Sequence, residues 1–551
     1  MLKTNSIRQI QKQNLKTLFN KLENNWKILI LDDTTFPIIS PLFTVQELRE
    51  SNIATIYMLE SKRTAVKTNA FYFISKDLSF VLDDMRQDLY LTYNIFSLDS
   101  LRRQELERFA LESAKTKRAS QVHSVFDSFQ NFVCLQDNLF TSNIENSFRK
   151  ISAANFAENF TKKVGENFSE RIDENFTKKT GENFTKKTAE KTGEKIANSL
   201  FSVLFQIGEN TPKIIYNEKS AAAMEVAQCL SGRLNSRREL LKSKKSLLKR
   251  PLLILFDRLD DVLTPIKHVW TYSGLIKDLL PFDDNRVTLP NGKRQSLAAD
   301  DEFWQKQQNE FFPAVAQKID EEYRLYKKDM ARHSLHRDST QEEIRQVLEK
   351  APELARRSES VNAHMEICLS LVDAIKERGI DDYYRTESSP YSEGAIADLE
   401  TKGTPLDAAR LACCVYAAAS REEAGRILAG RGLSEEIMQK LGKYNIKREE
   451  ASGTFYNKVV TGVLGKIENL LPRNVELPIS KFVENCLENK HYIYNNQIII
   501  KDEISRIIVY SIGGGTYIES KSLRELQERI GVPIVYGSTE VLSAESFMQQ
   551  L

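Results

Sequence analysis

The chain has 551 residues, which is too long for one hydrophobic core and predicts about three or four domains. Apolar residues make up 41% and charged residues 28% of the chain, as is ordinary for a soluble globular protein. The 78 basic and 76 acidic residues leave a net charge of +2, without the basic excess that is typical of nucleic-acid-binding proteins. We interpret the most basic run, Arg237–Arg250, as a solvated linker.

The six cysteines are spread along the chain, and only Cys413 and Cys414 are close together. No CxxC pair or Cys/His ligand set occurs, so the sequence predicts free thiols in a reducing compartment and no metal site. The N-terminus lacks a signal-peptide pattern, and the uncharged stretch Ser199–Gly208 is far shorter than the ~20 residues of a membrane span. We therefore expect a cytoplasmic protein whose membrane contact is peripheral.

The first 135 residues alternate between helical and strand patterns. An amphipathic helix is predicted within the first 25 residues and another helix at Val45–Glu50. Strands are predicted at Trp26–Asp32, Ile53–Leu59 and Ala70–Ile74. This alternation is typical of βαβ units, so residues 1–135 are predicted to form an N-terminal α/β domain with a mainly parallel sheet.

A second group of predicted strands is split along the chain, and the pattern between its halves, 269–480, is mostly helical. The sequence therefore predicts a split α/β domain at 136–268 and 481–551, interrupted by a helical insertion domain at 269–480. The fold class is α/β with a large helical insertion. The four strands are predicted at Lys213–Tyr216, Pro251–Asp257, Arg506–Ile512 and Pro533–Tyr536.

Residues 159–190 contain an octapeptide repeat, with units beginning at Asn159, Asn167, Asn175 and Asn183. Eight residues advance a helix about 80° beyond whole turns, so the repeated phenylalanines do not share one face. The repeat is also shorter than the ~20 residues of solenoid units. We interpret it as an expanded surface connection that is dispensable for folding; an array of phenylalanine anchors for a partner is the alternative.

Three patterns could carry chemistry, and each has a structural alternative. The glycines at 513–515 follow a strand, but the spacing fits neither GxGxxG nor a Walker motif, so a tight turn explains them equally well. The acidic run Asp257–Asp261 is interpreted as a strand terminus that fixes the turn at Thr264–Pro265, not as a metal or acid–base site. His333 and His336 lack a third ligand nearby. We predict a binding protein that needs no cofactor.

Two further segments have helical spacing. Thr340 and Glu343 form a capping-box pattern, and the following apolar residues lie along one helix face until Pro352, which is predicted to kink or end the helix near Ala351. These apolar residues are Ile344, Val347, Leu348, Ala351 and Leu354. Two more helices are predicted at Glu105–Ala114 and Gln121–Phe132, and spacing alone would make their apolar residues ordinary core.

Motifs from end to end of the chain resemble the SM (Sec-one/Munc-eighteen) family, and the His268 and Trp270–Tyr272 pattern resembles its Sly-type branch of ER–Golgi traffic. No single motif is decisive, but their order and spacing extend over most of the chain. The N-terminal matches are Trp26–Asp32, Ile38–Leu42, Val45, Glu47–Arg49, Phe126–Phe129 and Asn131–Val133. The later matches are Pro251–Arg258, Asp261, Thr264–Pro265, His268, Trp270–Tyr272, Asp278–Leu280, Phe303–Lys306, Phe312–Pro313, Gly403–Pro405 and Val509–Glu519.

The resemblance implies a three-domain arch and a non-enzymatic regulator of SNARE-mediated fusion. The implied partners are a syntaxin-like Qa-SNARE and SNARE bundles, the implied location is the ER and Golgi membrane surface, and a monomer is expected. The N-terminal peptide of the SNARE would bind a groove between paired helices, lined by Leu106, Phe109, Ala110, Val122, Val125 and Phe126.

In the helical domain, the loop at 332–362, shorter than in Sly-type proteins, could place Ile344, Val347, Leu348 and Leu354 as a lid over the SNARE-bundle surface. Packing of this segment on the helical domain is the simpler interpretation. The alternatives for the whole chain are an SM protein of endosomal or vacuolar traffic and a nucleotide-dependent α/β enzyme that uses Gly513–Gly515.

Overall fold

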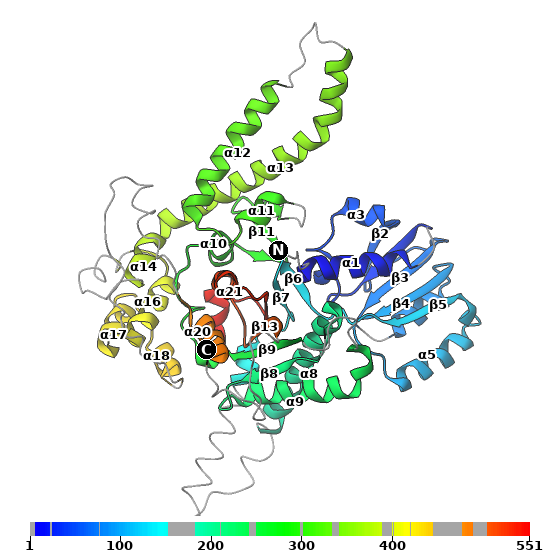
Figure 1. Ribbon diagram of the computed structural model, residues 1–551, viewed down its shortest axis with the longest axis horizontal. Helices are drawn as coiled ribbons and strands as arrows, with labels where there is room; N and C mark the ends of the chain where they lie inside the picture. The colour runs from blue at the N-terminus through cyan, green and yellow to red at the C-terminus, as the bar shows by residue number, and fades with distance from the viewer. Residues whose placement is uncertain are drawn as a thin grey trace, which may run out of the picture. The chain divides into compact units, whose positions relative to one another are not determined.

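The computed structural model divides into two compact units (Figure 1). The first unit comprises Met1–Arg258, Phe482–Gly515 and Leu523–Glu540, and the second comprises Leu259–Lys481, Thr516–Ser522 and Val541–Leu551. The residues that the structure describes are 6–21, 25–75, 78–152, 182–209, 211–241, 249–297, 301–332, 341–387, 399, 402–418, 420–442, 444, 476–488 and 504–551.

The N-terminal part of the first unit contains a five-stranded parallel sheet in the order β2-β1-β3-β4-β5. Its strands are β1 (Lys27–Leu31), β2 (Ile53–Met58), β3 (Asn69–Ile74), β4 (Thr92–Ser97) and β5 (Val122–Asp127). The predicted strands and the predicted helix at Val45–Glu50 are confirmed.

Helices cover both faces of this sheet because successive strand side chains alternate between the faces. One face packs on α4 (Ser79–Arg86) and α5 (Arg103–Lys115), and its core contains Ile30, Tyr72 and Tyr93. The other face meets α1 (Ile7–Asn20), whose Phe19 ring lies 5.3 Å from Phe71. Two short helices, α2 (Phe36–Ile39) and α3 (Val45–Glu50), and the 3-10 turn η1 (Ala119–Gln121) complete this region.

The first unit also contains a six-stranded sheet in the order β6-β7-β14-β13-β9-β8, in which only the β6–β7 pair is antiparallel. The C-terminal strands β13 and β14 lie between strands from the first half of the chain, so the split strand prediction is confirmed. The strands are β6 (Val133–Gln136), β7 (Leu139–Thr141), β8 (Lys213–Tyr216), β9 (Arg250–Asp257), β13 (Ile504–Ile512) and β14 (Ile534–Ser538). The accompanying helices are α8 (Glu182–Ile207), α9 (Ala221–Ser236) and η2 (Arg238–Leu241).

The second unit is mostly helical, as predicted, with one small antiparallel sheet of β10 (Phe282–Asp283), β11 (Arg286–Thr288) and β12 (Arg294–Ser296). Its main helices are η3 (Arg258–Asp260, at the boundary), α10 (Tyr272–Leu279), α11 (Glu302–Gln307), α12 (Phe312–Arg332), α13 (Gln341–Arg378), α14 (Ile380–Glu387), α16 (Pro405–Ala418), α17 (Arg421–Gly430), α18 (Glu436–Leu441) and α22 (Ala544–Gln550). Helices α20 (Pro478–Glu488) and α21 (Tyr517–Ile530) begin in the second unit and end in the first.

The fold class is therefore confirmed as two mainly parallel α/β sheets with a large, mostly helical insertion. Both sheets lie in the first unit, and β6 already belongs to the second sheet although the predicted boundary falls at residue 135. The domain boundaries at 135, 268 and 480 stay predictions.

One helix prediction is wrong, because residues 122–127 of the predicted helix Gln121–Phe132 form the strand β5. Of the two outcomes predicted at Pro352, a kink or an end of the helix near Ala351, the helix does not end there, because α13 continues through Pro352. Of the octapeptide repeat, residues 159–181 lie outside the described residues, and the remainder begins α8. The capping residue Thr340 and the pair His333 and His336 also lie outside them.

Candidate functional site

Helix α5 exposes apolar side chains on the flank that faces away from α4. Successive helical residues are rotated by about 100°, so Glu112 lies to one side of Phe109 on the helix surface. Leu106 and Ala110 lie to the other side of Phe109. Phe109 is 5% exposed in the core, and Glu112 faces α4 through an ion pair with Arg86 at 3.6 Å. Leu106 is 38% exposed and Ala110 is exposed as well. The exposed flank therefore points toward the open edge of the sheet at β5.

Strand β5 contributes two valines next to this helix. The register between β4 and β5 shifts at Tyr93/Asn94, where Val122 pairs with Tyr93 and Ser124 pairs with Asn94, so His123 forms a bulge. The extra residue brings Val122 and Val125 to the same face, and both pack, half-buried, against the core that contains Phe109. We call Leu106, Phe109, Ala110, Val122 and Val125 the α5–β5 surface.

Phe126 lies on the opposite face of the sheet, apart from the other five predicted groove residues. Its ring centroid is 5.7 Å from that of Phe96, and Phe96 stacks on Phe71 at 4.1 Å. The Lys21 ammonium lies 5.2 Å from the Phe126 ring, and Phe126 remains 47% exposed. The six residues predicted to line one groove thus occupy two faces of a sheet edge, and one wall is a strand instead of a second helix.

The second candidate surface is the pair of helices α12 and α13, which lie side by side and extend away from the other helices of the second unit (Figure 1). Arg357 of α13 donates to Asp329 at 2.8 Å and to Glu322 at 3.0 Å on α12. From Asp320 to Ala331 and from Ala351 to Ser360, no described side chain is buried. These parts of the two helices therefore offer side chains to solvent or to a partner.

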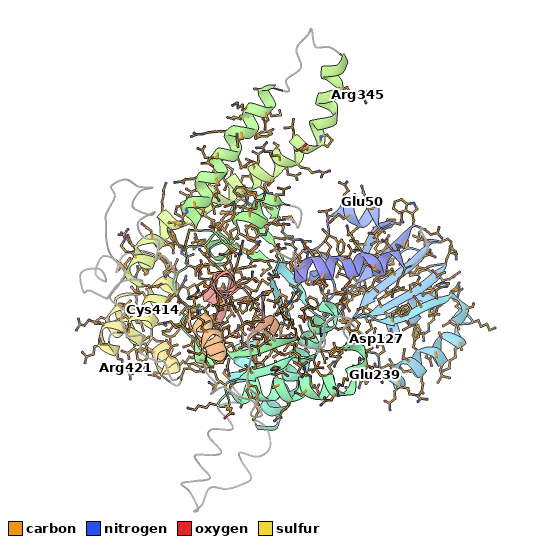
Figure 2. The ribbon with its side chains drawn as sticks, viewed as in Figure 1. Glu50, Asp127, Glu239, Arg345, Cys414 and Arg421 are labelled. Carbon is orange, nitrogen blue, oxygen red and sulfur yellow. The ribbon has the colours of Figure 1, made fainter. Side chains whose placement is uncertain are left out.

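The predicted lid residues all lie on α13, near its N-terminal end, where Figure 2 labels Arg345. Leu354 is half-buried. The side chains of Ile344, Val347 and Leu348 lie outside the described residues. Because α13 continues past Pro352, the lid segment is one end of a long helix and not a separate short helix.

The carboxyl end of β1 is the position where open α/β sheets of this strand order bind ligands, since the order reverses between β1 and β3. Asp32 lies there and is buried. Its Oδ1 accepts hydrogen bonds from the Thr34 and Thr35 amides and the Thr35 hydroxyl, and its Oδ2 accepts from the Ser75 amide at 2.7 Å and hydroxyl at 2.9 Å. Both carboxylate oxygens of Asp32 thus accept hydrogen bonds from the loops that follow β1 and β3.

The triple glycine forms a turn whose polar groups are already used within the chain. Gly513 and Gly514 have φ angles of +93° and +102°, which favour glycine. The carbonyl of Gly514 accepts from the Arg258 guanidinium at 2.8 Å and from the Ser511 hydroxyl at 2.7 Å, while the Gly515 amide donates to the Glu540 carbonyl. This arrangement favours the architectural interpretation of the glycines over a phosphate-binding loop.

The acidic run after β9 is also architectural. Asp261 accepts from the amides of Leu263 and Thr264 at 3.2 and 3.0 Å, which fixes the turn before Pro265 as predicted. Asp257 accepts from the Ser220 hydroxyl at 2.5 Å. Among the described residues, no three His, Cys, Asp or Glu side chains are grouped so that they could hold a metal ion.

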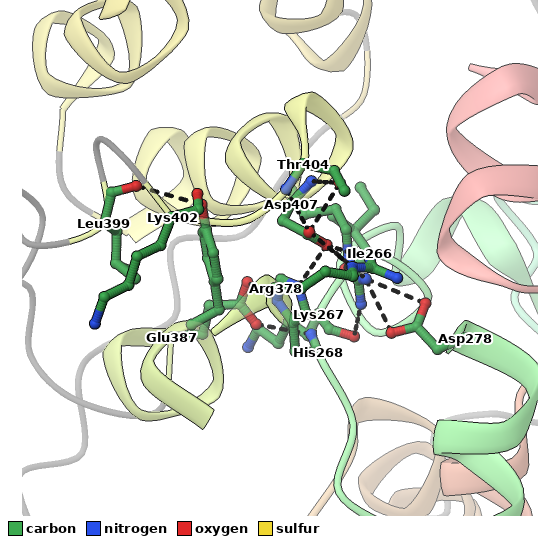
Figure 3. A network of polar contacts seen from close by, with 12 residues as sticks. Ile266, Lys267, His268, Asp278, Arg378, Glu387, Leu399, Lys402, Thr404 and Asp407 are labelled. Atoms are coloured by element: carbon green, nitrogen blue, oxygen red, sulfur yellow. Dashed lines mark hydrogen bonds and ion pairs between the residues drawn. The ribbon is translucent and has the colours of Figure 1, made fainter. Parts of the chain in front are cut away.

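A cluster of buried charged side chains lies in the second unit around His268 (Figure 3). The His268 Nδ1 atom lies 2.7 Å from Glu387 Oε1, and its Nε2 atom lies 3.2 Å from Asp407 Oδ1. Asp407 also accepts from Arg378 at 2.5 and 3.0 Å, and Arg410 contacts Asp278 at 2.9 Å. We call these six side chains the His268 cluster.

The geometry of the His268 cluster requires a protonated imidazole. A neutral ring has one N–H, but both ring nitrogens of His268 face carboxylate oxygens. Burial and Arg410 lower the pKa of His268, but Glu387 and Asp407 outweigh them, so the pKa lies above its ordinary value. Burial raises the pKa of Asp407, but hydrogen bonds from His268 and Arg378 and the charge of Arg378 hold it below its ordinary range. Burial also raises the pKa of Glu387, but the charge of His268 and its hydrogen bonds hold it below its ordinary range. With three carboxylates and three cations, the cluster is neutral.

The His268 cluster and its surroundings explain the motif that runs from His268 through Trp270–Tyr272 to Asp278. His268 and Asp278 belong to the cluster, Trp270 stacks on Tyr384 at 5.4 Å, and the Tyr272 hydroxyl lies 2.9 Å from His364 Nδ1. The motif therefore builds the core of the helical unit. Sequence reasoning missed Glu387 and Asp407 as partners of His268, since they follow it by 119 and 139 residues.

Comparison with known proteins gives consistent results along the whole chain. The profile of the Sec1 family matches residues 27–550. The chain is 34% identical to the SEC1 family transport protein SLY1 of Encephalitozoon cuniculi over 556 residues, covering 99% of this chain and 98% of the relative.

Solved structures show the same fold. Sly1p in complex with an N-terminal peptide of Sed5p has a TM-score of 0.75 and 19% identity, covering 100% of this chain and 98% of that chain. The SM protein Vps45 in complex with the Qa SNARE Tlg2 (1–310) has a TM-score of 0.77 and 18% identity, covering 99% and 97%.

Proposed function

The chain belongs to the Sec1 family, and we propose that it regulates SNARE-mediated vesicle fusion in ER-to-Golgi and intra-Golgi transport. It would act by binding a syntaxin-like Qa-SNARE and SNARE bundles, without catalysing a reaction. The observation that carries this proposal is the 34% identity to a SLY1 transport protein over 99% of the chain. The SM protein Vps45, solved in complex with the Qa SNARE Tlg2, is only 18% identical to this chain, so its likeness supports the fold alone.

The α5–β5 surface is the proposed docking site for the N-terminal peptide of the Qa-SNARE. The small side chain of Ala110 leaves space beside the exposed Leu106, and Phe109, Val122 and Val125 provide an apolar floor. A large apolar side chain of the peptide would gain about 1.5–3 kcal/mol if fully buried there. Support comes from the related Sly1p structure, which contains an N-terminal peptide of Sed5p.

The α12–α13 pair is the proposed surface for SNARE bundles. A bundle of helices would pack against its solvent-facing side chains, among which Leu325 and Met330 are large and apolar. The start of α13, with Ile344, Val347, Leu348 and Leu354, would restrict access to this surface as a lid.

Membrane recruitment would depend on these partners and would make the protein peripheral on ER and Golgi membranes. None of the helices in the described ranges is both long and apolar enough to cross a membrane.

The substitution Ala110→Leu tests the peptide site. Because Ala110 is exposed, leucine there should change the free energy of unfolding by no more than about 0.5 kcal/mol while it blocks the surface. Gln104→Leu, on the exposed opposite flank of α5, is the matched control. Fluorescence anisotropy with a labelled peptide of the first ~20 residues of a syntaxin-like Qa-SNARE should show at least tenfold weaker binding for Ala110→Leu only. Equal affinity of both variants would place the peptide elsewhere.

A further inference from the structure

Three apolar side chains lie at the amino end of the N-terminal sheet, where the chain enters neighbouring strands. Trp26 precedes β1, Val66 lies in the loop before β3, and Leu91 precedes β4. Because β1 and β4 both pair with β3, Trp26 and Leu91 flank the same segment at Thr68. The Thr68 hydroxyl donates to the Trp26 carbonyl at 2.7 Å, and the Leu91 amide donates to the Thr68 carbonyl at 3.0 Å. We call Trp26, Val66 and Leu91 the amino-edge patch.

The side chains of the amino-edge patch keep much of their apolar surface in water. Trp26 is 57% exposed, Leu91 48% and Val66 38%. The other two tryptophans, Trp270 and Trp304, are buried. A single exposed apolar residue is ordinary, but several that lie on adjacent segments are typical of a contact site. The amino-edge patch is therefore a candidate interaction surface.

The segments around the amino-edge patch are basic. The last residues before β3, β4 and β5 contain three cations and one carboxylate. These segments are 64–68, 87–91 and 116–121, and their charged residues are Lys67, Asp88, Lys117 and Arg118. Asp88 lies between two of the cations, since Lys67 contacts it at 3.0 Å and Arg118 also pairs with it. The exposed Lys117 follows the end of α5, so positive charge adjoins the apolar side chains.

We propose that the amino-edge patch binds the surface of an anionic membrane. Tryptophan favours the membrane interface, where its ring lies among the lipid headgroups, and exposed aliphatic side chains enter the acyl boundary below. Lysine and arginine near an anionic leaflet add electrostatic attraction. The patch consists of side chains from separate loops, so a fluid lipid surface, which adapts to them, suits it better than a protein of fixed shape.

Direct contact with lipid adds a second attachment to the one that the proposed SNARE partners supply. Three cations and three apolar side chains give only weak, reversible binding on their own. A SNARE in the same membrane would raise the effective concentration of the patch at the lipid surface, so the two weak contacts would act together. Lipid binding itself is measured without SNAREs, so the inference stands or falls independently of the proposed function.

Co-flotation of the full-length protein with SNARE-free vesicles tests the inference. Vesicles of phosphatidylcholine with about 30% phosphatidylserine should bind the protein at least about fivefold better than vesicles of phosphatidylcholine alone, because basic residues are attracted to the anionic surface. Added salt should reduce the difference, since it screens this attraction. Equal binding to both kinds of vesicle, or no binding to either, overturns the inference.

Substitutions separate the amino-edge patch from other surfaces. Leu91→Ser and Lys117→Glu should each weaken binding to the anionic vesicles at least about threefold. The matched controls lie elsewhere in the first unit and should leave binding unchanged. They are Leu240→Ser, at a leucine that is 47% exposed, and Lys219→Glu, at an exposed loop lysine. Equal losses in the controls would mean that binding is not confined to the patch, which overturns the inference.

Quenching by brominated lipid locates the contact. Bromine on the acyl chains quenches an indole only at short range, so the buried Trp270 and Trp304 should be unaffected while Trp26 is quenched. Tryptophan emission of the wild type should fall when it binds anionic vesicles that contain brominated phosphatidylcholine, and Trp26→Phe should abolish the fall. Quenching that persists in Trp26→Phe, or binding without quenching in the wild type, overturns the inference.

Failure of the inference and failure of the proposed function are distinguishable. If the full-length protein does not bind anionic vesicles, the amino-edge patch is left for a protein partner. The proposed function would survive that result, because the SNARE-peptide assay contains no lipid.

Discussion

Replacing His268 by leucine should destabilise the second unit more than any substitution of a surface ion pair. The Glu387 carboxylate, buried beside His268, accepts from the His268 ring and from the His268 backbone amide. Leucine keeps the amide but removes the imidazolium, so Glu387 becomes a buried charge without its cation. Removing one member of a buried ion pair costs about 3–5 kcal/mol. Asp407 is affected less, because Arg378 still donates to both of its oxygens.

The pH dependence of this contribution follows from the directions of the pKa shifts. The pKa of His268 is raised in the folded protein, so its contribution is fully present below the ordinary histidine pKa of about 6.5 and is lost as pH rises through the folded-state value. The pKa values of Glu387 and Asp407 are lowered, so their contributions are lost as pH falls below about 4. The difference between wild type and His268→Leu should therefore be largest between about pH 5 and 6.5.

Tryptophan fluorescence can follow this unit selectively. Trp270 and Trp304 are buried in the second unit, and the third tryptophan, Trp26, lies in the first, so a Trp26→Phe background removes the unwanted signal. Urea unfolding at pH 6 is compared between His268→Leu and Lys306→Ala, which breaks the exposed pair with Glu302 and should cost less than about 1 kcal/mol. Equal unfolding midpoints for the two variants, or a pH-independent difference, would refute the role of the His268 cluster.

Three other perturbations test separate parts of the structure. Replacing residues 159–181 of the octapeptide repeat by a Gly/Ser linker should leave the melting temperature within a few degrees, and loss of cooperative unfolding would show that the repeat belongs to the core. Deleting residues 337–356 should raise SNARE-bundle binding in a pull-down at unchanged stability; unchanged binding with lower stability would mean that the start of α13 is core. Gly513→Ala should lower stability in urea unfolding by about 1–3 kcal/mol, because its added Cβ would lie 3.0 Å from Arg258 at positive φ, whereas Gly531→Ala, at positive φ in open space, should cost less.

The strands and the split sheet could be predicted because their apolar runs are short and bounded by turn residues. The same reasoning failed at β5 for a physical reason. Val122, Val125 and Phe126 have the spacing of a helix face, since the bulge at His123 inserts one residue between the two valines. A bulge depends on pairing with β4, which the local sequence does not reveal.

The helix α13 also shows the limit of local rules. Proline removes a helical hydrogen bond and usually ends a helix, yet α13 continues past Pro352, and Arg357 one turn later joins it to α12 through Glu322 and Asp329. The contacts between α12 and α13 thus outweigh the helix-breaking preference of Pro352. The partners of His268 could not be predicted either. Glu387 and Asp407 are more than 100 residues away in the sequence, and no local pattern indicates that they contact the histidine in the folded chain.

Fusion of reconstituted liposomes tests the central claim most directly. Lipid mixing is measured between vesicles that carry a complete set of ER–Golgi SNAREs, and in parallel between vesicles with an endosomal set, with and without the full-length protein. The account predicts that the protein accelerates mixing of the ER–Golgi set and that Ala110→Leu reduces the effect while Gln104→Leu does not. No acceleration would contradict the proposed function, and acceleration of the endosomal set alone would assign the protein to endosomal traffic.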